Sequence, residues 1–169
     1  MKPQMNRRVL ACDPGFERLG IAVLEKQSGK ETVLYSDCLR TSPSISFPER
    51  LAQLGADIET LIATWQPSCM ALEDIFFEKN AKTAMGVAQV RGMLAYIAAT
   101  HGMEVESYTP LQVKVAITGY GKSSKEQVGS MVVRLVSLPA RQRLDDEMDA
   151  IAVGLTALAS ARYPHTGKE

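Results

Sequence analysis

A short apolar run that ends in a carboxylate, a proline and a glycine constrains this chain more than any other feature. The residues from Val9 to Cys12 are apolar and partly β-branched, which is typical of a buried strand. Pro14 has no N–H to give to a sheet and Gly15 permits a sharp turn, so the strand ends at Asp13. A carboxylate in this place either caps the turn or binds a cation, because a buried charge needs a partner. This stretch alone leaves both interpretations open.

Length and composition favour one globular domain and argue against several classes of protein. The 169 residues suffice for one hydrophobic core, and we expect a single domain over 1–169 with its core at about 9–160. No apolar run is long enough to cross a membrane, so we expect no membrane partner. Three cysteines in strand-like runs fit a reducing cytoplasm better than a disulfide framework. A net charge of zero argues against a uniformly basic nucleic-acid binder, although it leaves room for a local basic face.

Strand-like and helix-like segments alternate along the chain and predict an α/β fold. The expected strands are 9–12, 20–25, 32–39, 69–72 and 105–108, and the expected helices are 48–65, 83–101, 110–117, 124–135 and 145–162. Three strands followed by alternating helices and strands predict a mixed five-stranded sheet with helices on both faces. A ligand site is then expected at the carboxyl ends of the parallel strands, where Asp13 and Glu73 both stand.

Two further acids stand on the last predicted helix. Residues three apart share a helix face, so Asp146 and Asp149 can project together. The helix dipole accounts for acids in a first turn, but it explains Asp149 poorly because Asp149 borders the apolar stripe. With Asp13 and Glu73 these residues make four carboxylates, which would repel one another without cations. Such a set suits magnesium, and two ions can activate a water and stabilise a leaving oxygen in phosphodiester cleavage.

Basic residues and two phenylalanines lie near the acids in the sequence. A single charge on a loop is usually only solvated, but a group of them near a nuclease site can hold phosphates. Phe76 and Phe77 follow Glu73, and either ring can be part of the core or stack on an unpaired base. Small residues along 83–101 either pack on their own sheet or meet a symmetry mate in a twofold dimer. The basic residues are Lys79, Lys82, Arg91, Lys114, Lys122, Lys125, Arg134, Arg141 and Arg143.

The order of these motifs resembles the RuvC family of Holliday-junction resolvases, which are crossover junction endodeoxyribonucleases with a ribonuclease-H-like fold. Singly each motif is weak, but together and in order they are specific, from about residue 9 to residue 158. The matching segments are Asp13-Pro14-Gly15, Leu72-Glu73-Asp74-Ile75-Phe76, Lys79-Asn80-Ala81, Gln112-Val113-Lys114 and Asp146-x-x-Asp149-Ala150-x-Ala152. The resemblance places the metal-binding carboxylates of the family on Asp13, Glu73, Asp146 and Asp149. It places the catalytically important lysines on Lys114 and Lys125, and the junction-probing aromatic residue on Phe76.

The same resemblance implies a metal-dependent, structure-selective endonuclease that resolves four-way DNA junctions by paired nicks in recombination and repair. It implies two Mg²⁺ ions per active site with Mn²⁺ as a substitute, a homodimer, a cytoplasmic location and a branch-migration helicase complex as a partner. We expect the DNA contacts to include Phe76, Lys79, Lys82 and Lys122. The alternatives are a related ribonuclease-H-like nuclease that acts on RNA or on other branched DNA, and a junction-binding protein with weak catalysis. Parallel cleavage assays on junction, flap and RNA–DNA hybrid distinguish these functions.

Overall fold

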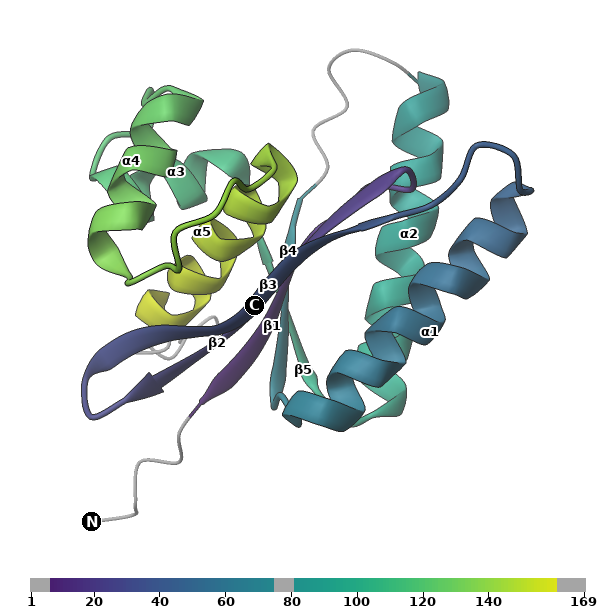
Figure 1. The fold of residues 1–169 in the computed structure, drawn as a ribbon, viewed down its shortest axis with the longest axis horizontal. Helices are drawn as coiled ribbons and strands as arrows, with labels where there is room; N and C mark the ends of the chain where they lie inside the picture. Colours follow the sequence, from purple (N-terminus) through teal and green to yellow (C-terminus); the bar gives the residue numbers. More distant parts are fainter. Residues whose placement is uncertain (1–6, 75–80, 161–169) are drawn as a thin grey trace, which may run out of the picture.

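The computed structural model describes residues 7–74 and 81–160, which form one mixed sheet covered by helices on both faces (Figure 1). The strands are β1 (Arg8–Asp13), β2 (Arg18–Gln27), β3 (Lys30–Arg40), β4 (Cys69–Glu73) and β5 (Glu104–Tyr108). The helices are α1 (Phe47–Trp65), α2 (Ala81–Thr100), α3 (Pro110–Thr118), α4 (Lys125–Leu135) and α5 (Asp145–Ser160). The predicted α/β fold with five strands is therefore confirmed. Within the described ranges, every helix is too short or too polar to cross a membrane.

Strand β1 lies at the centre of the sheet, whose order is β3-β2-β1-β4-β5. It pairs antiparallel with β2, which continues through a hairpin into β3, and it pairs parallel with β4. Strand β5 extends the parallel part of the sheet beyond β4. Because β1 and β4 run in the same direction, their carboxyl ends meet at one edge of the sheet. Asp13 and Glu73 are the last residues of these two strands.

Alternating side chains divide the core into two clusters, one on each face of the sheet. Val9 and Ala11 of β1 belong to a cluster formed with α3, α4 and α5, whereas Leu10 and Cys12 belong to a cluster formed with α1 and α2. Figure 1 shows the same division, with α1 and α2 on one side of the strands and α3, α4 and α5 on the other. Successive side chains of a strand point to opposite faces, so Asp13 follows Ala11 onto the face covered by α5.

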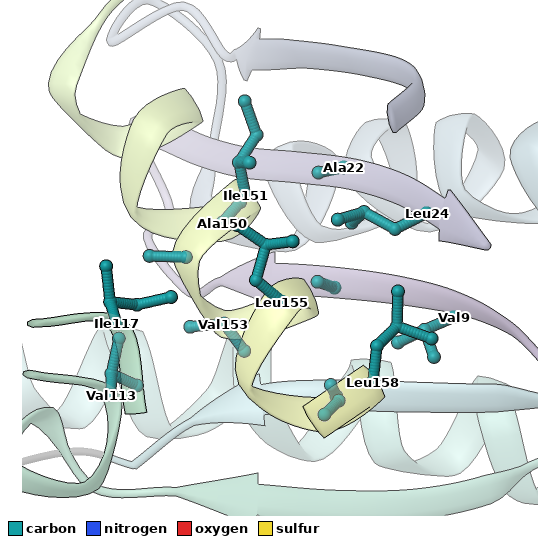
Figure 2. Close-up of a cluster of buried hydrophobic side chains, with 14 of the residues drawn as sticks. Val9, Ala22, Leu24, Val113, Ile117, Ala150, Ile151, Val153, Leu155 and Leu158 are labelled. Carbon is teal, nitrogen blue, oxygen red and sulfur yellow. The ribbon is translucent and has the colours of Figure 1, made fainter. Parts of the chain in front are cut away.

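Helix α5 is buried along most of its length because it lies directly on β1 and β2. Its apolar side chains meet those of the two strands in Figure 2, where Leu155 and Leu158 lie near Leu24 and Val9. A Cβ atom on Gly154 would come within 2.2 Å of Leu24 Cδ1. A Cβ atom on Gly20 of β2 would come within 1.9 Å of the backbone oxygen of Asp146. Helix α5 can therefore approach the sheet this closely only because these two residues are glycines and have no Cβ atom.

We predict that Gly20→Ala lowers the free energy of unfolding by roughly 1–3 kcal/mol, because the added methyl group must push the first turn of α5 off the sheet. Gly129→Ala is the matched control, since Gly129 lies within α4 and a Cβ atom there would meet nothing within 4 Å. Its alanine should raise stability by about 0.5–1 kcal/mol, because glycine is costly inside a helix. Urea unfolding of both variants tests this, and equal stability of Gly20→Ala and the wild type would contradict the close approach.

Candidate active site

Two carboxylates meet where the central parallel strands end. The register pairs Cys12 of β1 with Leu72 of β4, so Asp13 and Glu73 follow as neighbours at the same edge of the sheet. Both face α5, since they continue the alternation of residues that pack on that helix. Their carboxyl groups share a hydrogen bond. The sequence reaches this arrangement by ending both strands in an acid.

The first turns of α5 bring Asp146 and Asp149 to the same place. Asp13 pairs with Gly20 across β1 and β2, and the backbone oxygen of Asp146 lies directly over Gly20. Asp149 stands three residues further along and so lies on the same face of the helix. Asp13 interacts electrostatically with all three of the other carboxylates. The structure thus brings the four predicted acids together, while their role as metal ligands stays a prediction.

Crowding of the carboxylates changes their protonation. Burial raises the pKa of Asp13 to about 8, and the negative charges of Glu73, Asp149 and Asp146 act in the same direction. Burial also raises the pKa of Glu73, against the lowering effect of its hydrogen bond with Asp13. Near neutral pH the Asp13–Glu73 pair therefore retains a proton that two isolated carboxylates would have lost. A divalent cation that displaced this proton would remove the repulsion.

The two lysines singled out by the sequence lie on different helices beside the acids. Lys125, the first residue of α4, places Nζ 2.7 Å from Oδ2 of Asp149 and 3.8 Å from Oδ2 of Asp145. Burial opposes its charged form, but the hydrogen bond to Asp149 and the negative charges of the nearby carboxylates together outweigh burial and raise the pKa of Lys125. Lys114 of α3 lines the same cavity of about 210 Å³ as Lys125, Asp149 and Glu73. Two cations thus border the carboxylates on the side of α3 and α4.

Asp146 carries the strongest sign that a cation belongs in this site. Its Oδ2 atom is buried and has no hydrogen-bond donor among the described residues. The nearest cation is Arg18, whose Nε lies 3.4 Å away on a side chain that is 55% exposed. A buried carboxylate oxygen without a donor is costly unless an ion meets it. Carboxylate oxygens are the type of ligand that Mg²⁺ prefers. The four carboxylates are thus compatible with the expected metal.

A second acidic cluster lies at the opposite ends of the parallel strands. One ligand atom each from Cys69, Glu104 and Glu106 lies within 4.8 Å of the others. Arg7 already fills this position, because its Nη2 lies 2.5 Å from Glu106 Oε1 and 3.3 Å from Cys69 Sγ. Burial also raises the pKa of the Cys69 thiol to about 11, which disfavours the thiolate that binds metals. We therefore assign this cluster to the binding of Arg7.

The predicted DNA contacts are only partly within the described residues. Phe76, Phe77 and Lys79 lie outside them, as does the side chain of Lys82 at the start of α2. Lys122 is exposed on the loop between α3 and α4. Its loop joins the two helices that carry Lys114 and Lys125, so Lys122 lies on the same side of the carboxylates as they do.

Several arginines that lie near the acids in the sequence form ion pairs with acids in the structure. Arg91 of α2 donates to Asp74 Oδ1 at 2.7 Å, next to Glu73. Arg141 and Arg143 both pair with Glu147, whose side chain is only 2% exposed, and Ser36 of β3 donates to the same carboxylate at 2.6 Å. The sequence left open whether these arginines are only solvated or hold phosphates. Their ion pairs give them a role in the fold, whereas a contact with phosphate stays a prediction.

Glu147 is the residue that sequence reasoning missed. It stands between the two candidate ligands of α5 and resembles an ordinary first-turn acid that answers the helix dipole. In the structure it joins the start of α5 to β3 through Ser36 and to the preceding loop through Arg141. Two arginines four and six residues before it were a usable signal, because charges at such spacing often pair. Glu147 therefore helps to fix where Asp146 and Asp149 stand.

Comparison with known proteins identifies one family. The family model described as crossover junction endodeoxyribonuclease RuvC matches residues 9–157. Among curated proteins, the chain is 41% identical over 161 residues to the crossover junction endodeoxyribonuclease RuvC of Moorella thermoacetica, covering 95% of this chain and 96% of that protein. It is 42% identical over 147 residues to the protein of the same name from Desulforamulus reducens, covering 87% of this chain and 90% of that protein.

Solved structures show the same likeness. The structure of RuvC from Thermus thermophilus in complex with a Holliday junction substrate matches with a TM-score of 0.86 and 31% identity, covering 92% of this chain and 95% of that chain. A yeast mitochondrial Holliday junction resolvase matches with a TM-score of 0.69 at 14% identity, covering 90% of this chain and 78% of that chain. The second likeness concerns the fold alone.

We predict that Asp13→Asn stabilises the metal-free protein progressively as the pH rises from about 4 to 8. The pKa of Asp13 is about 8 in the folded protein and about 3.9 in the unfolded chain, so folding takes up a proton in this range. The stability of the wild type therefore falls as the pH rises, whereas asparagine has no proton to lose. The expected difference at pH 8 is roughly 1–3 kcal/mol.

Thermal melts in EDTA across this pH range measure the difference. Asp57→Asn, on α1 at the other face of the sheet, is the control and should follow the wild type. Added Mg²⁺ should raise the melting temperature of the wild type more than that of Asp13→Asn. Parallel pH curves for the wild type and Asp13→Asn would show that Asp13 is not a crowded carboxylate.

Proposed function

The chain belongs to the RuvC family of crossover junction endodeoxyribonucleases, and we propose that it resolves four-way DNA junctions by paired, metal-dependent nicks in recombination and repair. The convergence of Asp13, Glu73, Asp146 and Asp149 beside Lys114 and Lys125 carries the proposal. A nuclease acting on phosphodiesters needs concentrated oxygen ligands with cations at their border, and this edge of the sheet supplies both. We propose that residues 9–160 act as one nuclease domain.

Asp13, Glu73, Asp146 and Asp149 are the residues that would hold the metal, for which we propose Mg²⁺. When bound, two divalent ions at such a site activate an attacking water and stabilise the leaving oxygen. The shared proton of Asp13 and Glu73 must leave before both carboxylates can act as ligands. The buried Oδ2 of Asp146 needs no such change, since it already lacks a donor. The four acids therefore differ in how ready they are for a cation.

Lys125 and Lys114 are proposed to act on the phosphate itself. Lys125 donates a hydrogen bond to Asp149, so its ammonium group lies beside the carboxylates that would hold the metal. In this place the ammonium group can stabilise charge that develops on the scissile phosphate. Lys114 lines the same cavity and can hold the phosphate in place. Both roles need a positive charge close to the metal ligands.

Cleavage of synthetic substrates tests the proposed function. A labelled four-way junction, a flap and an RNA–DNA hybrid are incubated with the protein, each with and without Mg²⁺. We expect symmetric nicks in the junction only with Mg²⁺, no cutting by Asp13→Asn, and retained junction binding by that variant. If the protein cut the hybrid or the flap in preference to the junction, the four-way junction would not be its proposed substrate. If the wild type bound the junction without cutting it, the protein would be a junction-binding protein and not a nuclease.

We predict that Lys114→Ala and Lys125→Ala each lower the single-turnover cleavage rate at saturating enzyme by about 10²-fold while changing the Kd for the junction little. Lys122→Ala is the control, because this residue is exposed on the loop away from the cavity lining. It should weaken binding and leave the saturating rate unchanged. A loss of affinity alone in the Lys114 and Lys125 variants would make these lysines phosphate-binding residues without a part in the chemical step.

A homodimer is the assembly that we propose. Helix α2 exposes Met85 by 65% and Tyr96 by 70%, and between them a Cβ atom on Gly92 would meet nothing within 4 Å. These residues share one face of the helix, which offers flat apolar surface to a second copy. A four-way junction has near-twofold symmetry and needs two cuts, and a twofold dimer supplies two sites.

The three buried free thiols fit a reducing cytoplasm, which is the location that we propose. A branch-migration helicase complex is a further proposed partner.

We predict that Tyr96→Glu gives a monomer, because a charge on this face opposes burial against a second copy. Val133→Glu, at a residue of α4 that is 59% exposed, is the control and should remain dimeric. Sedimentation measures the assembly, and a plasmid with an extruded cruciform measures the cuts, since paired nicks linearise it whereas single nicks only relax it. A Tyr96→Glu protein that stays dimeric and linearises the plasmid would place the interface elsewhere.

A further inference from the structure

Two arginines stand directly opposite each other where β2 begins and β3 ends. The register pairs Arg18 with Arg40. Like charges directly opposite on neighbouring strands repel each other and destabilise the sheet. Among the described residues, the guanidinium group of Arg40 has no hydrogen bond or ion pair, and Arg18 has only its contact with Asp146. This pair thus concentrates positive charge that the described part of the chain neutralises only in part.

The pair lies on the face of the sheet that carries the candidate active site. Arg18 precedes Gly20 by two residues, and Arg40 follows Cys38 by two, so both arginines share the face covered by α5. The thiol of Cys38 lies close enough to Asp146, Arg40 and Arg18 to be affected by all three charges. Burial raises its pKa, Asp146 raises the pKa further, and Arg40 and Arg18 lower it. The two cations therefore border the carboxylates on the side away from α3 and α4.

The turn after β1 holds this pair in place. Thr41, directly after Arg40, donates its backbone N–H to the oxygen of Glu17 at 3.1 Å and its hydroxyl to the oxygen of Phe16 at 2.5 Å. The residues before Arg18 are thus tied to the residue after Arg40. Both arginine backbones are fixed by these bonds and by the strand pairing, whereas the side chain of Arg18 is 55% exposed and free to choose its partner.

We propose that Arg18 and Arg40 together bind one backbone phosphate of the DNA strand that passes the four carboxylates, an inference that rests on the proposed nuclease function. A phosphate between the guanidinium groups relieves their repulsion and accepts hydrogen bonds from both. The contact of Arg18 with Asp146 can be exchanged, because 3.4 Å is too long for a strong hydrogen bond and the side chain of Arg18 is 55% exposed. The phosphate then takes the place of Asp146 as the partner of Arg18.

Salt dependence of binding tests this proposal. Arg18→Gln and Arg40→Gln are compared with the wild type on a four-way junction and on linear duplex in EDTA, where no cutting occurs. Each variant should bind several-fold more weakly and lower the slope of log K against log salt by about one. Lys30→Gln is the matched control, because Lys30 begins the same strand roughly 30 Å from Arg40 and is exposed. It should leave the slope unchanged.

A series of junctions, each with one neutral methylphosphonate near the cleavage site, locates the contact. At one position the wild type should lose affinity, whereas Arg18→Gln and Arg40→Gln should lose no more, because the contact is already absent. Unchanged salt slopes, or additive losses at every position, would overturn the proposed phosphate site. Failure of the nuclease function gives a different result, since the wild type would then leave the junction uncut in Mg²⁺ whatever the slopes measured in EDTA.

Discussion

Helix α5 can lie against the sheet only because two glycines leave room for it. At Gly20 the backbone of the helix itself touches β2, and at Gly154 the helix meets Leu24. This approach places Asp146 above the strand that pairs with β1, and hence beside Asp13. A helix held a few ångströms further away would leave the acids of α5 and the acids of the strands as two separate pairs. The candidate active site is therefore a consequence of close packing between a helix and a sheet.

Such packing concentrates negative charge, and the structure tolerates it in three ways. Asp13 and Glu73 share a proton, because burial and the negative charge of nearby carboxylates such as Asp149 raise the pKa values of both. Asp149 is neutralised by Lys125 through a hydrogen bond. Asp146 has only a 3.4 Å contact with the exposed Arg18. The compensation is incomplete, so this edge of the sheet favours cations more strongly than any one of its carboxylates would. We therefore expect the affinity for metal proposed for this site to follow from the folding of the chain.

Local patterns predicted most of this site, whereas the contacts that align it are not local. Asp13 and Glu73 could be placed because each follows a readable strand, and Asp146 and Asp149 because helical spacing fixes a shared face. The part played by Gly20 could not be predicted, since it depends on which strand α5 crosses. Glu147 resembled a first-turn acid because its burial depends on β3, more than a hundred residues earlier in the chain. The roles of the site residues remain predictions.

The zero net charge of the chain is compatible with DNA binding once the charges are placed in space. The four carboxylates of the candidate active site lie at one edge of the sheet. Lys114 and Lys125 border them on the side of α3 and α4, and the Arg18–Arg40 pair borders them on the side of β2 and β3. Several arginines elsewhere in the described part of the chain are paired with acids, as Arg141 is with Glu147. A strand of DNA crossing this edge would meet cations, then the carboxylates that we propose as metal ligands, then cations again. Phosphates on either side of the cleavage site can thus be held without a basic surface over the whole molecule.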